Sequence, residues 1–387
     1  MIYDLVIYNA HIINPADNMD QMGAVLIKQH KIMSVTSDMN VVPEIESVQK
    51  INAHGCYLFP GLIDFHVHAA RGINMLGLSP DAAMLPNGVT SIVDQGSVGA
   101  SAFPAFFRSV ICQSDLSVRS FLHVNTDGLA HHPLQENTDP RYYDIDAIQN
   151  MLDLYRQVIC GLKVRIGGLV TDRGYEPLAA AKSIARQFQL PLCAHIVRPD
   201  HPYSELLPIL SQGDIVAHCF QPGPQYTILS QNGQILPDVL DARKRGVLFD
   251  LAAGRANHSL NICRQAALNG FFPDILSTDL VTHSIYSPTL FSLPRILSIF
   301  LQLGMPLMDL VRACTHTPAK AMNPGSQLGT LTPGSRADIA IFKLENIDTI
   351  MRDEYGDFLP LSQLFIPQMT VLNGQIVYRQ ITFADWV

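Results

Sequence analysis

The sequence predicts an α/β protein, a (β/α)8 TIM-type barrel joined to a small β-sandwich domain that is built from both chain termini. Three observations lead to this prediction. Eight short apolar runs recur in the middle of the chain, segments with helical periodicity separate them, and β-branched runs occupy both ends. We therefore expect residues 1–55 and 325–387 to form the β-sandwich domain and residues 56–324 to form the barrel.

The two ends of the chain resemble each other more than either resembles the middle. DLVIYNAHII, AVLIKQ and KIMSV lie near the start, and ADIAIF, MTVLNG and QIVYR lie near the end. Asn373 and Gly374 separate the last two runs, and this pair is a strong signal for a type I′ hairpin turn because both residues tolerate positive φ. These runs therefore predict strands of one composite domain.

The apolar runs of the middle section predict eight parallel strands. They are YLFPGLIDFHVH, VTSIVDQG, VRSFLHVN, ICGLKVRI, LPLCAHI, DIVAHCF, GVLFDLA and DILSTDL. Strands that are apolar on both faces and alternate with amphipathic helices are typical of a closed parallel barrel. An open doubly wound sheet is the alternative. The count of eight and the lack of a glycine-rich dinucleotide motif after the first run favour the barrel.

Composition excludes several classes of protein. Of the 387 residues, 48% are hydrophobic and only 16% are charged, which excludes a disordered chain. The net charge of −8 argues against nucleic acid as a partner, and no run approaches the roughly 20 apolar residues that span a membrane. The start has no basic segment of a secretory signal, and the seven cysteines form no CxxC pair. We expect a cytoplasmic enzyme with reduced thiols.

Two histidines in the first predicted barrel strand are candidate metal ligands. The segment DFHVH places Asp64, His66 and His68 on one face, because side chains of a strand alternate with a period of two. Two imidazoles on the same face can bind one ion, but hydrogen-bonded core histidines would give the same pattern. This motif alone leaves both interpretations open.

Four further polar residues lie in later predicted strands, close to their carboxyl ends. They are Lys163 in the fourth strand, His195 in the fifth, His218 in the sixth and Asp279 in the eighth. The carboxyl ends of barrel strands meet at one mouth, where barrel enzymes carry their active sites. A lysine in an apolar strand is costly to bury unless it is paired or neutralised. Together with the histidine pair, these residues predict a metal site.

Several longer stretches carry a resemblance to a known family. They are FPGLIDFHVH at 59–68, GLKVRIG at 161–167, AHI at 194–196, AHCF at 217–220, STDL at 277–280 and LGTLTPGSRADIAIF at 328–342. With these motifs the chain resembles the amidohydrolase superfamily, especially binuclear members such as dihydroorotases and hydantoinases. Within it, the chain is similar to a dihydroorotase-like, amidohydrolase/deacetylase subgroup whose members hydrolyse acyl esters or N-acyl groups.

The resemblance implies a ligand set and a reaction. His66, His68 and Asp279 would bind one divalent ion, and His195 and His218 a second. Lys163, carboxylated by CO₂, would bridge the two ions. Such nitrogen and oxygen donors suit zinc first, with manganese, cobalt or iron as alternatives. The implied enzyme is a binuclear metal-dependent hydrolase that cleaves an ester or amide (acyl) bond of a small molecule by metal-bridged hydroxide attack, with Asp279 as general acid and base.

Three residues are candidate substrate contacts. Arg165 shares a strand face with Lys163, so it would reach a substrate carboxylate or order the carboxylated lysine, unless it forms a structural ion pair. Arg255 and His258 lie in AAGRANHS after the seventh strand, a loop expected to border the mouth. Arg255 departs from the subgroup pattern and suggests that the substrate carries an anionic group.

Other functions on the same fold remain open. One is a cyclic amidohydrolase of the dihydroorotase or hydantoinase type, although Ala70 stands where dihydroorotases carry a substrate-binding arginine and the arginine here is Arg71. A deaminase is disfavoured by Lys163, because deaminases of the superfamily usually use one metal. A non-catalytic relative would lose ligands, whereas all six are present. By the same resemblance we expect a homo-oligomer acting on a small acylated substrate.

Overall fold

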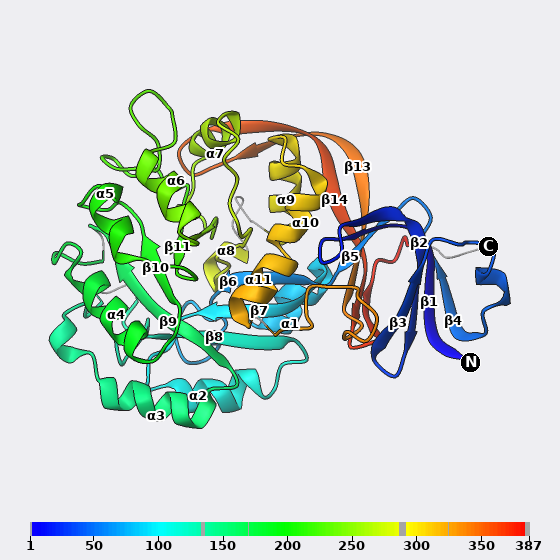
Figure 1. Cartoon of the computed structure of the whole chain (residues 1–387), viewed down its shortest axis with the longest axis horizontal. Coiled ribbons are helices and arrows are strands. Elements are labelled where there is room, and N and C mark those ends of the chain that lie inside the picture. The colour runs from blue at the N-terminus through cyan, green and yellow to red at the C-terminus, as the bar shows by residue number, and fades with distance from the viewer. Residues whose placement is uncertain (1, 133–135, 169, 286–291, 324, 384–387) are drawn as a thin grey trace.

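The computed structural model describes residues 2–132, 136–168, 170–285, 292–323 and 325–383. In that part of the chain, the strands form two sheets. One is a parallel sheet of seven strands from the middle of the sequence, and the other is a mixed sheet of eight strands from both ends (Figure 1). This arrangement confirms the predicted fold class.

The central sheet follows the order of the sequence. Its strands are β6 (Leu62–Val67), β7 (Val89–Gln95), β8 (Ser117–His123), β9 (Ile159–Ile166), β10 (Leu192–Ile196), β11 (Ile215–Ala217) and β12 (Leu248–Asp250). Each strand pairs in parallel with the next, from β6 to β12. Helical connections cross over between the strands, as parallel pairing requires.

The eighth predicted strand closes this sheet but is irregular. Ile275 forms an isolated parallel bridge with Asp250 of β12, and Leu280 forms one with Val67 of β6. Between these bridges, the Thr278 amide donates to the carboxylate of Asp64 (3.0 Å) instead of to a carbonyl group of a strand. The segment 275–280 therefore joins β12 to β6 without a continuous ladder of backbone hydrogen bonds.

α-Helices connect the strands of the central sheet and follow its closing segment. They are α1 (Pro80–Met84), α2 (Phe103–Phe106), α3 (Ile145–Tyr155), α4 (Glu176–Gln187), α5 (Tyr203–Leu206), α6 (Pro237–Lys244), α7 (Leu260–Leu268), α8 (Thr282–Ile285), α9 (Leu293–Gln302), α10 (Leu307–Ala313) and α11 (His316–Met322). Short 3₁₀ turns cover Val42–Glu44, Leu85–Asn87, Pro140–Tyr142 and Leu207–Ile209, and a π-helical turn covers Phe107–Ile111. No helix in the described part of the chain is long and apolar enough to cross a membrane.

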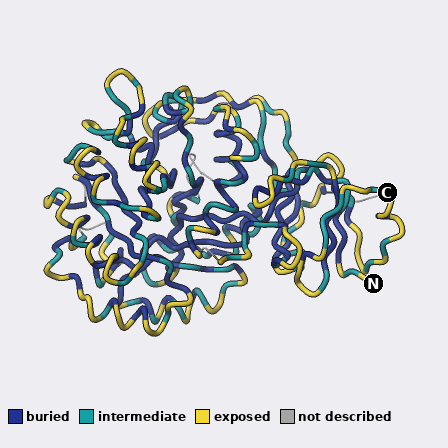
Figure 2. Tube along the Cα trace, in the orientation of Figure 1, coloured by how far each residue is buried: buried dark blue, intermediate teal, exposed yellow. Residues whose placement is uncertain are grey.

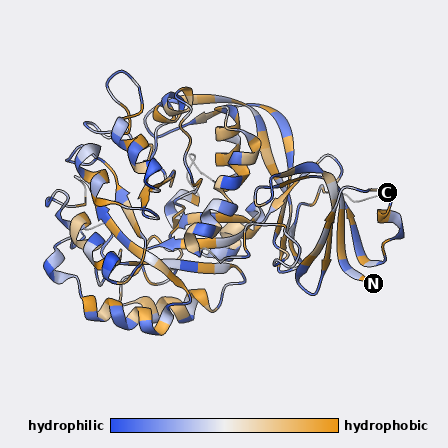
Figure 3. Ribbon diagram, viewed as in Figure 1, coloured by the Kyte–Doolittle hydropathy of each residue, from blue (hydrophilic) through white to orange (hydrophobic). Residues whose placement is uncertain are grey.

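The helix α3 illustrates how the sequence produces these elements. Asp144 caps its start by accepting a hydrogen bond from the Ala147 amide (2.9 Å). Ile148, Met151 and Leu152 follow at helical spacing and are the buried residues of α3. Hydrophilic and hydrophobic residues accordingly alternate around this helix in Figure 3.

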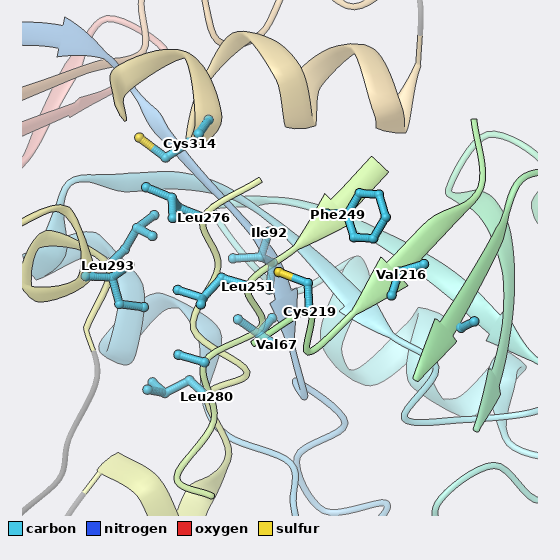
Figure 4. Packing of buried hydrophobic residues seen from close by; sticks show 14 of the residues in the cluster. Val67, Ile92, Val216, Cys219, Phe249, Leu251, Leu276, Leu280, Leu293 and Cys314 are labelled. Carbon is cyan, nitrogen blue, oxygen red and sulfur yellow. The ribbon is translucent and has the colours of Figure 1, made fainter. Parts of the chain in front are cut away.

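The main hydrophobic core lies between the central sheet and its helices. Figure 2 shows the central strands buried along most of their length. Figure 4 shows side chains of β6 (Val67), β12 (Phe249) and the closing segment (Leu276) in this core, together with Leu293 of α9 and Cys314. This packing explains why the sequence of each predicted strand is a continuous run of apolar residues.

The terminal sheet combines both ends of the chain. Its strands are β1 (Tyr3–Asn14), β2 (Met19–Lys28), β3 (Lys31–Thr36), β4 (Ser47–Asn52), β5 (Tyr57–Pro60), β13 (Ile339–Arg352), β14 (Phe358–Leu372) and β15 (Gln375–Arg379). The order is β15-β14-β13-β5-β1-β2-β3, with β4 paired to β1. The first predicted barrel run is thus divided, with β5 in the terminal sheet and β6 in the central sheet.

The hairpin predicted at Asn373 and Gly374 connects β14 to β15. Both residues have positive φ, 51° and 79°, and Leu372 pairs with Gln375 across the turn. This confirms the turn signal in the sequence. The predicted domain boundaries, one of which falls at residue 324 outside the described residues, stay a prediction.

A buried ion pair at the base of the central sheet should stabilise the fold. Lys182 of α4 contacts Asp214, and both side chains are buried. Removing one partner of a buried pair leaves an uncompensated charge, so Lys182→Ala should lower the free energy of unfolding by about 3–5 kcal/mol. Urea unfolding measures this change.

The matched control is Lys343→Ala, which removes an exposed lysine paired with Glu345. An exposed pair contributes about 0–1 kcal/mol. Equal losses of stability in the two variants would contradict the assigned role of the buried pair.

Candidate metal centre

Five of the six predicted metal ligands line a pocket of about 420 Å³ at the carboxyl ends of the central strands, and His218 is not among its lining residues. Its walls come from these strand ends and from the loops that follow them. The lining residues are His66, His68, Leu76, Leu129, His132, Lys163, Arg165, His195, Arg255, Ala256, Asn257, Asp279, Val281, His283 and Ser284. The convergence of the strand ends thus brings distant parts of the sequence to one place.

His66, His68 and Asp279 form the most compact group of potential ligands. Their ligand atoms lie within 4.8 Å of one another, and all three side chains are buried. The Oδ1 atom of Asp279 lies 3.3 Å from Nε2 of His68 and 3.7 Å from Nε2 of His66. The Asp279 amide donates to the His66 carbonyl (2.7 Å), which fixes the closing segment against β6.

Neighbouring side chains orient the two imidazoles. Asp250 lies 3.0 Å from Nδ1 of His66, and Ser97 Oγ lies 2.8 Å from Nδ1 of His68. The Ser97 hydroxyl donates its hydrogen to Asp94 (2.6 Å), so it accepts from His68 Nδ1. In both rings Nδ1 faces a partner, and Nε2 is left directed at Asp279.

This arrangement fits a bound cation. Two imidazole nitrogens and a carboxylate oxygen face the same space, and their lone pairs would repel one another unless a positive charge lay between them. Burial lowers the pKa of His66 well below its usual value, and the nearby Lys163 lowers it further. The neutral ring keeps the lone pair that a metal requires.

His195 and His218 form a second pair beside the first group. Their ring centroids lie 4.3 Å apart, and the His218 ring lies 5.1 Å from that of His66. His218 Nδ1 donates to the Ala252 carbonyl (2.8 Å), while its buried Nε2 has no hydrogen-bond partner among the described residues. Burial lowers the pKa of His218 to about 4 and also lowers that of His195. Both neutral rings can therefore act as ligands.

Lys163 lies between the two groups and is only 1% exposed. Its Nζ lies 3.4 Å from His66 Nε2 and 3.5 Å from Cys193 Sγ. Within the described residues it forms no ion pair with a carboxylate, which is unusual for a buried lysine.

Two glycines allow the close packing around these groups. A Cβ atom on Gly96 would lie 2.7 Å from Cβ and Cγ of Lys163, and one on Gly254 would lie 2.6 Å from Asp279 Oδ2. Both residues also have positive φ, which disfavours any other residue. The backbone therefore touches the site directly at these two points.

The predicted substrate contacts have different positions. Arg165 lines the pocket and donates to Glu136 (2.9 Å), which also lies 3.0 Å from His123. Arg255 lines the pocket with a side chain that is 58% exposed, and its Nε lies 3.7 Å from Glu354. His258 is buried behind the loop, where its Nδ1 donates to the Ala253 carbonyl (2.8 Å), and it is not among the lining residues.

Sequence reasoning missed several residues of the site. Asn257 donates to Oδ2 of Asp279 (2.8 Å), and Asp250 and Asp94 support the two histidines. The two aspartates had a weak signal in the sequence, because each is the one charged residue of its predicted strand, VTSIVDQG or GVLFDLA. Glu136 comes from a loop and His283 from the short helix α8, and neither segment has a periodic pattern that would mark a functional side chain.

Known proteins resemble this chain over most of its length. A model described as amidohydrolase family matches residues 209–377. A deacetylase of Brucella anthropi is 30% identical over 352 residues, which are 90% of this chain and 86% of that protein. A deacetylase of Agrobacterium fabrum is 31% identical over 331 residues, 85% of this chain and 81% of that protein.

Solved structures agree in fold with these relatives. A crystal structure of an adenine deaminase has a TM-score of 0.88 at 25% identity and covers 98% of this chain and 100% of its own. A crystal structure of a dihydroorotase has a TM-score of 0.86 at 28% identity and covers 97% and 98% of the two chains.

Gly96 provides a test of the close packing at Lys163. In Gly96→Ala, the new methyl group would displace Lys163, so the affinity for Zn²⁺ should fall by at least about tenfold, as for the loss of supporting groups around a metal. Competition with a chromophoric chelator measures the affinity.

Gly55→Ala is the matched control, because Gly55 has the same φ of 74° but no atom within 4 Å of an added Cβ. It carries the same backbone strain without the contact. Zinc affinity in Gly96→Ala equal to that in Gly55→Ala would contradict the proposed packing.

Proposed function

The chain belongs to the amidohydrolase family and is a hydrolase, and from that premise we propose that it cleaves an ester or amide bond of a small acylated molecule. The observation that carries this proposal is the buried group of His66, His68 and Asp279 at the mouth of the barrel. The relatives named as deacetylases support an acyl group as the part removed.

We propose that two divalent ions, zinc first, bind at this mouth. His66, His68 and Asp279 would hold one ion, and His195 and His218 the other, with carboxylated Lys163 between them. The neutral buried imidazoles of His66, His195 and His218 support this set, and so does the buried amine of Lys163, which forms no ion pair with a carboxylate of the described residues. When bound, such ions would polarise a substrate carbonyl and lower the pKa of a water molecule.

We propose Asp279 as the general acid and base. Its Oδ1 faces the two imidazoles, whereas Oδ2 lies at the pocket wall beside Asn257. We propose that Oδ2 takes a proton from the attacking water and returns it to the leaving nitrogen or oxygen. The hydrogen bond from Asn257 would keep this atom directed at the substrate.

Arg165 and Arg255 would bind an anionic group of the substrate. Both line the pocket, and the Arg165 guanidinium is held in place by Glu136. The ring of His258 is buried behind the loop that follows β12. His258 would therefore affect substrate binding indirectly, by supporting that loop.

A cyclic amidohydrolase or a deaminase is the second candidate function. The likeness to the solved dihydroorotase and adenine deaminase favours it. Against a dihydroorotase, Ala70 is buried and Arg71 is exposed and does not line the pocket. The guanidinium expected to bind the substrate carboxylate is thus not supplied from this position.

The cellular setting is also a proposal. All seven cysteines are free thiols, and five of them are buried, which supports a reducing, cytoplasmic location. We also propose a homo-oligomer, as barrels of this superfamily commonly form.

Asp279→Asn should test the catalytic role. With a substrate taken from a panel of N-acyl and O-acyl acids, kcat should fall by about 10²–10⁴-fold, since the amide cannot carry the proton. Steady-state kinetics at saturating zinc measure this. Asp241→Asn, at an exposed position of α6, is the control, and a kcat for Asp279→Asn equal to that of the control would contradict the role.

Dihydroorotate should be a poor substrate or none, because no arginine at position 70 binds its carboxylate. Ultraviolet absorbance follows its hydrolysis. A turnover number in the usual enzymatic range, about 1–10³ s⁻¹, would contradict the acyl-hydrolase proposal.

A further inference from the structure

The long hairpin of β13 and β14 leaves the terminal sheet and extends over α9 toward α7 (Figure 1). Its tip, residues 353–357, contacts the loop of residues 253–260 that follows β12. This loop carries Arg255 and Asn257, which line the pocket. Two segments that lie about a hundred positions apart in the sequence thus meet beside the candidate metal centre.

Asp353 makes the central contact of the tip. Its side chain is buried, and Oδ2 accepts a hydrogen bond from the amide of Leu260, the first residue of α7 (2.8 Å). Its Oδ1 accepts from the amides of Tyr355 and Asp357, both at 2.9 Å. The carboxylate of Asp353 therefore stabilises the turn at the tip and also holds the end of the loop against the tip.

Two further contacts hold the loop from the same side. The Tyr355 hydroxyl donates to the Ala256 carbonyl (2.6 Å), and Ser259 Oγ donates to the Asp357 carboxylate (3.3 Å). Glu354 lies 3.7 Å from Arg255, as noted above. The tip thus contacts the loop on both sides of Asn257.

The opposite side of the loop packs against the closing segment. The Gly254 amide donates to the Thr278 carbonyl (2.8 Å), and Asn257 donates to Asp279. Gly254 lies so close to Asp279 that no side chain fits between them. A shift of the loop would therefore change the surroundings of Asp279.

We propose that the tip formed by residues 353–357 is a positioning element of the active site, which holds the loop so that Asn257 orients Asp279 and Arg255 faces the substrate. Its consequence for substrate turnover rests on the proposed acyl-hydrolase activity and its effect on metal binding on the proposed metal site, whereas its effect on the loop rests on neither. Substitutions in the tip would change which substrates are selected without replacing any proposed metal ligand.

Tyr355→Phe and Asp353→Asn test this proposal. Tyrosine 355 is 40% exposed, so removing its hydroxyl should leave the fold intact and remove one hydrogen bond to the loop. Lys343→Ala on the same hairpin is the control, because Lys343 pairs with Glu345 and not with the loop. Asp353→Asn is the stronger variant, and Tyr355→Phe keeps the test valid if Asp353→Asn does not fold.

The first two readouts do not depend on a substrate. Amide hydrogen exchange of residues 253–262 should be about two- to tenfold faster in Tyr355→Phe, the effect of one hydrogen bond on local opening. Zinc affinity, from chelator competition, should fall by a similar factor. For any acylated acid that the wild type hydrolyses, KM should rise more than kcat falls.

Faster exchange in the loop together with weaker zinc binding, both absent in Lys343→Ala, would support the proposal. Unchanged exchange would overturn it, and so would faster exchange with unchanged zinc affinity, because the tip would then restrain the loop without affecting the site. If the wild type hydrolyses no acylated acid, the proposed function fails, and exchange and zinc affinity still decide this inference.

Discussion

The burial of ionisable side chains at one end of an apolar barrel is the constraint on which the rest of the structure depends. His66, Lys163 and His218 are each 1% exposed, and water cannot compensate their charge or polarity there. Burial keeps the imidazoles of His66 and His218 neutral by lowering their pKa. In His66, His68 and His218, Nδ1 is directed at Asp250, Ser97 and Ala252, respectively. The remaining lone pairs then face a common space.

Closure of the barrel serves the same site. The segment 275–280 is held by side chains as much as by backbone pairing, since Asp64 accepts from both the amide and the hydroxyl of Thr278 (3.0 and 2.6 Å). Burial raises the pKa of Asp64 to about 7, and the hydrogen bonds from Thr278 oppose that rise. An irregular closing segment lets Asp279 adopt a φ of 52° and turn its carboxylate toward His66 and His68.

Much of the fold and of the ligand set could be predicted because it follows local rules. The period of two along a strand placed His66 and His68 on one face, and the convergence of strand ends gathered Lys163, His195 and Asp279. The irregular closure, the burial of His258 and the role of Asn257 could not be predicted. They depend on contacts between loops and between segments far apart in sequence, such as Tyr355 with Ala256, which no local pattern encodes.

The central claim is that this mouth binds two divalent ions. The most direct test is the metal content of the wild-type protein, measured by mass spectrometry after purification without chelators and again after addition of zinc and bicarbonate. Two ions per chain are expected. One ion per chain after this addition would contradict the bridging role of Lys163, and none would contradict the metal centre as a whole.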